Sequence, residues 1–146
     1  MPMAERTATV VWRGDLAHGA GLVTAASGAF AELPVTWASR TERSDGKTSP
    51  EELIAAAHAA CYSMGLSFGL SQAGHAPERL DVAATCTLDL VDGAPTITTM
   101  HLDVVGTVPG LDAAAFEEAA QGAKEACPVS RALKGNLVVT LTARLA

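Results

Sequence analysis

The sequence predicts an α+β fold in which mainly antiparallel sheets surround one long apolar helix. Three observations predict it. A long helical signal lies between Gly46 and Gly74, strand-like stretches precede and follow it, and turn signals such as Asp92-Gly93 separate neighbouring strands. At 146 residues the chain is long enough to bury about two-thirds of its unfolded surface, and we expect one domain over residues 1–146.

The N-terminal third of the chain is predicted to consist of short strands separated by turns. Residues 7–12 are mostly β-branched or aromatic, a second strand is expected over 22–26, and a shorter third one over 35–38. The segment 40–47, RTERSDGK, is the most charged of the chain. We expect it to form a solvated loop that leads into the long helix.

The long helix is predicted to begin at Pro50. Ser49 supplies a cap, Glu52 three residues later completes a capping box, and Gly74 provides the stop signal. The helix is apolar on nearly every side, so we expect sheet or a second subunit to bury it. Polar residues interrupt the apolar run, and we therefore do not expect it to span a bilayer.

The segment after the helix becomes strand-like again. Apolar and polar residues alternate over 80–90 and again over 96–108, which predicts a β-hairpin. The remaining predicted elements are a helix over 113–125 capped by Asp112, a short helix that begins at Cys127-Pro128, and a closing strand over 137–144.

Charge and cysteine content limit the possible partners and compartments. The net charge of −6 argues against nucleic acid and against an anionic membrane surface, since both require a basic patch. No basic segment followed by an apolar run opens the chain, so no secretory signal is expected. Three cysteines without a CxxC pair fit a reducing cytoplasm, where thiols are free or used in chemistry.

Two of the cysteines are candidates for chemistry. Cys61 lies about three turns past the helix start, where the helix dipole has faded. Its ordinary interpretation is a small packed side chain, and a reactive thiolate there needs a cation from elsewhere. Cys127 lies at the start of a short helix with Arg131 one turn away, conditions that make a thiol more acidic. Local physics therefore favours Cys127, although an incidental cap residue is an equal alternative.

Other polar residues near these cysteines have weaker signals. Cys86 lies on the apolar face of a strand, where a structural role is expected. His58, three residues before Cys61, could polarise the thiol or only pack. Glu51 lies ten residues before Cys61, about 15 Å along a helix axis. It is therefore either a favourable acid at the helix start or a residue that acts across a dimer interface. The remaining histidines are scattered, so no metal site is expected: His18, His75 and His101.

Three motifs stand in the order and spacing of a known family. They are WRGD at 12–15, SPEELIAAAHAAC at 49–61 and ACPVS at 126–130. With them the chain resembles, nearly end to end, the OsmC/Ohr family of thiol-dependent peroxidases, and most of all its OsmC (osmotically inducible protein C) branch. The resemblance implies an OsmC-like fold, with antiparallel sheets wrapped around a long central helix in an intertwined homodimer.

The resemblance also implies a mechanism. Cys61 would be the peroxidatic cysteine, whose thiolate attacks an organic hydroperoxide, and more weakly hydrogen peroxide, to give a sulfenic acid. Cys127 would be the resolving cysteine, which condenses with it to an intramolecular disulfide. An external dithiol, possibly of the lipoyl type, would reduce that disulfide. Neither haem nor a metal is implied.

An arginine completes the implied site. In the family an arginine pairs with the glutamate that matches Glu51 and lies against the reactive sulfur at the subunit interface. Arg40 matches it best, with Arg43 and Arg13 as alternatives. Where the resemblance and local physics disagree, we follow the resemblance to Cys61, because a desolvated arginine can outweigh a helix end. The alternative functions are a peroxide sensor without turnover and a dimer that binds a small ligand.

Overall fold

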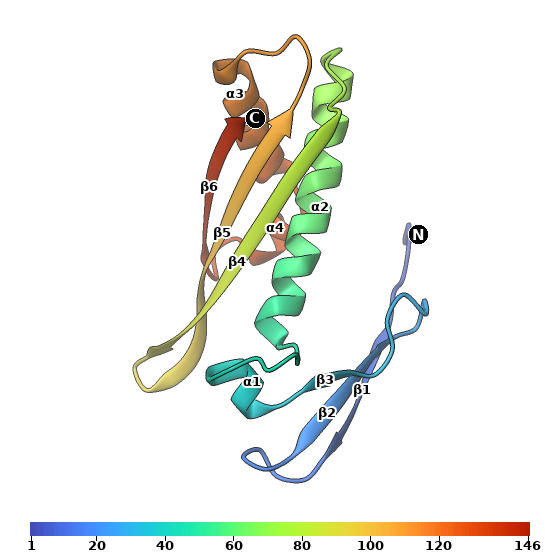
Figure 1. Ribbon diagram of the computed structural model, residues 1–146, viewed down its shortest axis with the longest axis vertical. Helices are drawn as coiled ribbons and strands as arrows, with labels where there is room; N and C mark the ends of the chain where they lie inside the picture. Colours follow the sequence, from blue (N-terminus) through green and yellow to red (C-terminus); the bar gives the residue numbers. More distant parts are fainter. The chain divides into compact units, whose positions relative to one another are not determined.

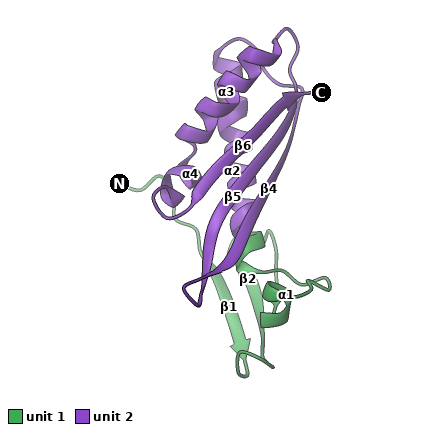
Figure 2. Ribbon diagram, turned by 90° about the vertical axis from the view of Figure 1, so that its left-hand side faces the viewer, with its two compact units in different colours: residues 1–53 green, residues 54–146 purple.

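A three-stranded sheet forms in each half of the chain. The computed structural model describes all 146 residues. They divide into two compact units, a first unit Met1–Leu53 and a second unit Ile54–Ala146, each with one of the sheets (Figure 2). The predicted α+β class is confirmed. The expectation of a single domain stays a prediction.

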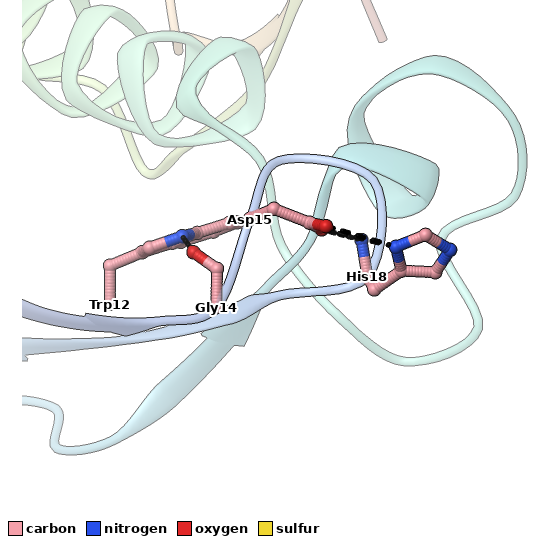
Figure 3. Close-up of polar contacts among 4 residues, drawn as sticks. All are labelled: Trp12, Gly14, Asp15 and His18. Atoms are coloured by element: carbon pink, nitrogen blue, oxygen red, sulfur yellow. Dashed lines mark hydrogen bonds and ion pairs between the residues drawn. The ribbon is translucent and has the colours of Figure 1, made fainter.

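The sheet of the first unit is antiparallel throughout. Its strands are β1 (Ala8–Arg13), β2 (Ala20–Ala25) and β3 (Leu33–Val35), hydrogen-bonded in that order. The turn between β1 and β2 is held by its own side chains (Figure 3). Asp15 accepts a hydrogen bond of 2.7 Å from the backbone N–H of His18, and Trp12 Nε1 donates one of 2.9 Å to the carbonyl of Gly14.

The predicted third strand is present, but it lies earlier than the expected run over 35–38, and a short helix replaces most of that run. The helix α1 spans Trp37–Thr41. Thr36 caps it in a capping box, since Thr36 Oγ1 accepts from the N–H of Ser39 and Ser39 Oγ accepts from the N–H of Thr36. This reciprocal pair of bonds outweighs the strand tendency of a very short apolar run. The helix also includes the first two residues of the expected loop 40–47.

The sheet of the second unit contains the predicted hairpin and one parallel pair. Strands β4 (Arg79–Val91) and β5 (Ala94–Thr107) are antiparallel neighbours, whereas β6 (Val138–Leu145) lies parallel to β5. The chain between β5 and β6 contains the helices α3 (Ala113–Ala126) and α4 (Pro128–Leu133). A parallel pair needs such a crossover connection, which explains this departure from an all-antiparallel sheet.

The long helix α2 spans Pro50–Gln72 and has the predicted ends (Figure 1). Ser49 Oγ accepts a bond of 3.1 Å from the N–H of Glu52, and the Glu52 carboxylate accepts from the hydroxyl of Thr48 at 2.8 Å. Gly74, with a φ of 85°, follows the last turn. Its positive φ suits a helix stop, because glycine has no Cβ to make that conformation unfavourable.

The core of the second unit lies between the helices and one face of the sheet. The Tyr62 hydroxyl is buried there and donates a 2.9 Å hydrogen bond to the carbonyl of Ala120 in α3. The alternation in the sequence puts Met100, Leu102 and Val104 on one face of β5, and all three are fully buried. The buried cluster consists of Tyr62, Leu66, Leu70, Leu102, Val104, Val108, Phe116, Ala120 and Cys127.

The other side of α2 does not lie in this core. Met64 and Phe68 are 73% and 66% exposed. The sequence predicted that sheet or a second subunit buries this helix, and on this side the chain's own sheet does not. By length and composition alone α2 is apolar enough to cross a membrane. Core helices of soluble proteins share that property, so it does not distinguish a spanning helix from a helix covered by protein.

The packing of α3 on the sheet gives a test of this core. A Cβ placed on Gly106 of β5 would lie 2.5 Å from two ring carbons of Phe116. We expect Gly106→Ala to lower the free energy of unfolding by about 1–3 kcal/mol, because the ring must move. In Gly122→Ala, a Cβ within α3 meets no atom within 4 Å, and stability should stay equal or rise. Denaturant midpoints compare them, and equal midpoints would contradict the packing.

Candidate active site

The two cysteines of the predicted pair lie together in the second unit. Cys61 is half-buried in the middle of α2, and its thiol lies within hydrogen-bonding contact of the Cys127 side chain. Cys127 is buried in the core at the junction of α3 and α4. Cys86 is elsewhere, half-buried on β4 and opposite Met100 of β5. The structure therefore brings the side chains of the two predicted cysteines into contact.

The start of α4 acts on Cys61. Cys127 is the N-cap residue of this helix, but its side chain makes no capping hydrogen bond. The backbone N–H of Val129, in the first turn, hydrogen-bonds the sulfur of Cys61 and favours its thiolate. From the sequence, the free N–H groups of this turn were expected to act on Cys127. One of them points to the other thiol instead, so the helix end and the family resemblance favour the same cysteine.

The remaining surroundings of Cys61 oppose ionisation. Burial raises the pKa of the Cys61 thiol and is the largest influence on it. The hydrogen bond from Val129 lowers that pKa, whereas the adjacent Cys127 raises it through its own hydrogen bond and charge. The net direction is upward. Within its own unit Cys61 therefore favours the neutral thiol, and a reactive thiolate requires a cation, as the sequence predicted.

A buried hydrogen bond lies beside the two thiols. His58 Nε2 and Ser130 Oγ are 2.7 Å apart, and both side chains are buried. Burial lowers the pKa of His58, so the ring is neutral at pH 7. Its Nδ1 atom is buried without a partner. The sequence left two roles open for His58, polarising the thiol of Cys61 or packing. The hydrogen bond to Ser130 of α4 supports the packing role.

Arg40 and Glu51 form an ion pair within the first unit. Arg40 Nε and Nη2 lie 2.9 and 2.8 Å from Glu51 Oε1, and the guanidinium lies 5.8 Å from the Trp37 ring centroid. Glu51 is buried, and its Oε2 atom has no partner. Arg43 makes only an exposed ion pair at 3.9 Å, and Arg13 makes none. Of the three candidate arginines, Arg40 is the one paired with Glu51.

The four predicted residues thus form two pairs, one in each unit: Arg40 with Glu51, and Cys61 with Cys127. Sequence reasoning did not identify Val129 or Ser130 as contacts of the helix that carries Cys61. A signal for Ser130 was present. It follows Cys127 by three residues, just as His58 precedes Cys61 by three, so each polar residue lies one helical turn from a cysteine.

Known proteins resemble this chain over most of its length. A family model described as OsmC-like protein matches residues 43–142. The Peroxiredoxin OsmC of Escherichia coli (strain K12) is 44% identical over 128 residues, which cover 88% of this chain and 89% of that protein. An organic hydroperoxide resistance protein of Xanthomonas axonopodis pv. citri is 35% identical over 98 residues, covering 65% of this chain and 66% of that protein.

A solved structure shares the fold. The organic hydroperoxide resistance protein OhrB of Bacillus subtilis superposes with a TM-score of 0.75 at 27% identity, covering 94% of this chain and 98% of that one. The OsmC-like fold expected from the sequence, with its two sheets and long helix, is therefore confirmed.

Proposed function

This chain belongs to the OsmC-like protein family, and from that premise we propose that it is a thiol-dependent peroxidase that reduces organic hydroperoxides. The observation that carries the proposal is the contact between the thiols of Cys61 and Cys127. The names of its relatives, Peroxiredoxin OsmC and organic hydroperoxide resistance protein, support the same reaction class. We therefore assign the two cysteines, which the sequence offered as separate candidates, to one redox-active pair.

The reaction proceeds in three steps. The thiolate of Cys61 attacks one oxygen of the hydroperoxide, the O–O bond breaks, and the other oxygen takes a proton and leaves as an alcohol. Cys61 becomes a sulfenic acid. The thiol of Cys127 then forms an S–S bond with Cys61 and releases water. An external dithiol, of the lipoyl type in our proposal, reduces the disulfide by exchange. The apolar surroundings of Cys61 favour an alkyl hydroperoxide over hydrogen peroxide.

The cation for the thiolate is assigned to Arg40. Its ion pair with the buried Glu51 supports this choice over Arg43 and Arg13, because the pair fixes the direction of the guanidinium. Because the Glu51 carboxylate already holds the guanidinium, Arg40 loses less conformational entropy than a free arginine would when it meets a thiolate. In the proposed site the guanidinium stabilises the charged form of Cys61 that burial opposes.

A second copy of the chain is the proposed partner. The exposed side of α2 presents Met64 and Phe68, and strand β1 exposes Val10, Val11 and Trp12. Large apolar side chains exposed on neighbouring turns of a helix, or along a strand, are typical of interaction sites. In a homodimer that covers α2, Glu51 at the start of one α2 would approach the middle of the other α2. Within a single straight helix, Glu51 is too far from the middle to reach it. We place this dimer in the cytoplasm, where free thiols persist.

Oxidation of the two cysteines tests the mechanism. After one equivalent of tert-butyl hydroperoxide, the intact mass should fall by two hydrogens through a disulfide between Cys61 and Cys127. Cys61→Ser should abolish turnover with a dithiol present, and Cys127→Ser should gain one oxygen as a sulfenic acid. Cys86→Ser is the matched control and should turn over like the original protein.

Other outcomes would favour other functions. Full turnover by Cys61→Ser would refute the assignment of the attacking sulfur. Oxidation of one equivalent with no recycling by any dithiol would favour a peroxide sensor. Two thiols unreactive to peroxide at neutral pH would favour a dimer that binds a small ligand and uses its cysteines only for packing.

Replacement of Arg40 tests the proposed cation. We expect Arg40→Ala to slow the oxidation of Cys61 about ten- to hundredfold, because a cation near a partly desolvated thiolate stabilises it by a few kcal/mol. Stopped-flow measurement with limiting hydroperoxide gives the rate, and circular dichroism checks the fold. Arg43→Ala, the control, should oxidise at the original rate. An unchanged rate in Arg40→Ala would move the role to another arginine.

A charge on the exposed side of α2 tests the dimer. Phe68→Glu should convert dimers to monomers at micromolar concentration, because it places a carboxylate in an apolar interface. Sedimentation equilibrium measures the mass. Gln121→Glu adds the same charge at a polar, exposed position of α3, away from the exposed side of α2, and should leave the dimer intact. A monomeric original protein, or dimers of equal strength in both variants, would contradict the proposal.

A further inference from the structure

We propose that the buried hydrogen bond between His58 and Ser130 is a positioning element that holds Cys127 against Cys61 during disulfide formation. The inference rests on the proposed peroxidase function and assigns two further residues to its second step. Neither residue contacts the hydroperoxide in this account. They act through the helices that carry the two sulfurs.

The bond joins the two helical turns on which the cysteines lie. His58 precedes Cys61 by three residues on α2, and Ser130 follows Cys127 by three residues in α4. Residues three apart on a helix are neighbours on one face. The 2.7 Å contact between His58 Nε2 and Ser130 Oγ therefore ties one turn of each helix to the other, across 72 residues of sequence.

The helix α4 depends on tertiary contacts to stay in place. It contains six residues, too few for a helix to be stable without tertiary contacts. Its N-cap residue, Cys127, makes no side-chain capping bond. Ser130 is the buried residue within α4. A hydrogen bond from that residue to a fully buried histidine is thus the polar anchor of the helix on α2.

This anchor does not depend on the state of the sulfurs. The other polar links between α2 and α4 pass through the sulfur of Cys61, namely its contacts with Cys127 and with the N–H of Val129. Both change when Cys61 becomes a sulfenic acid, since an oxygen then lies on that sulfur. The bond between His58 and Ser130 contains no sulfur and can persist through that step.

The surroundings of His58 suit a positioning role. Its Nε2 is engaged with Ser130 Oγ, and its Nδ1 is buried with no polar neighbour within hydrogen-bonding distance. A ring held in this way fixes a distance between the two helices. Burial also lowers the pKa of His58, so the bond joins two neutral groups at neutral pH.

Positioning matters during disulfide formation, because this step competes with further oxidation of Cys61. In that step the Cys127 thiol attacks the sulfenic sulfur of Cys61, the S–O bond breaks, and water leaves as the S–S bond forms. If Cys127 drifts away, a second hydroperoxide can oxidise the sulfenic acid to a sulfinic acid. A tie that keeps the two sulfurs adjacent raises their effective concentration and favours the disulfide.

Separate measurement of the two steps tests the inference. We expect Ser130→Ala and His58→Leu each to slow disulfide formation about tenfold and to increase trapping of Cys61 by dimedone. The rate of sulfenic acid formation should change less than about twofold. The double variant should be no slower than either single variant, because both remove the same bond.

Rescue and control variants separate positioning from general stability. Ser130→Thr keeps the hydroxyl and should restore the rate of disulfide formation. Ser63→Ala removes a hydroxyl that bonds within α2, to the carbonyl of Ala59 at 2.7 Å, and should leave both steps unchanged. Urea midpoints show whether each variant folds, and Ser130→Ala keeps a small side chain in case His58→Leu does not.

Each outcome decides between the claims. If Cys61 gives no sulfenic acid in the Cys127→Ser variant, the proposed function and this inference both fail. If it does, and Ser130→Ala forms the disulfide at the original rate, only the positioning role is refuted. Equal slowing of both steps, together with a lower urea midpoint, would assign His58 and Ser130 to stability alone.

Discussion

The contact between Cys61 and Cys127 depends on the packing of α2 against α4, and α3 helps to fix both helices. Tyr62, the neighbour of Cys61, is fixed in the core by its hydrogen bond to Ala120 of α3. The chain then passes directly from α3 to α4, with Cys127 between them as the C-cap of one helix and the N-cap of the other. One cysteine is thus held by α2 and the other by the junction of two helices, so both sulfurs have little freedom.

The burial that creates this contact also limits its chemistry. An apolar environment accommodates an alkyl hydroperoxide but raises the pKa of the Cys61 thiol, and only the thiolate is a good nucleophile. The N–H of Val129 offsets part of that effect. A single neutral donor is weaker than a full charge at low dielectric, which is why the proposed site needs Arg40 as well. Burial, the start of α4 and, in the proposed site, Arg40 together decide how readily Cys61 ionises.

Local signals in the sequence predicted the elements, and contacts between distant residues decided the rest. The hairpin of β4 and β5 and both ends of α2 were predictable, because alternation, Ser49 and Gly74 act within a few residues. The helix α1 was missed because a capping box at Thr36 outweighed a short strand-like run. The bond between His58 and Ser130 joins residues 72 positions apart. The spacing of each from a cysteine marks both residues, but no local pattern shows that they meet. Family resemblance supplied the pairing of the cysteines, which periodicity alone left open.

The composition of α2 is explained by two apolar faces. Tyr62, Leu66 and Leu70 recur every four residues and lie in the core, whereas Met64 and Phe68, also four apart, lie on the exposed side. A helix with a single apolar face would be strongly amphipathic. A helix that packs into its own unit on one side and against a second chain on the other would be apolar all round, as the sequence of α2 is. The apolar composition of α2, which predicts a fully buried helix, is therefore consistent with a structure in which its own chain covers only one side.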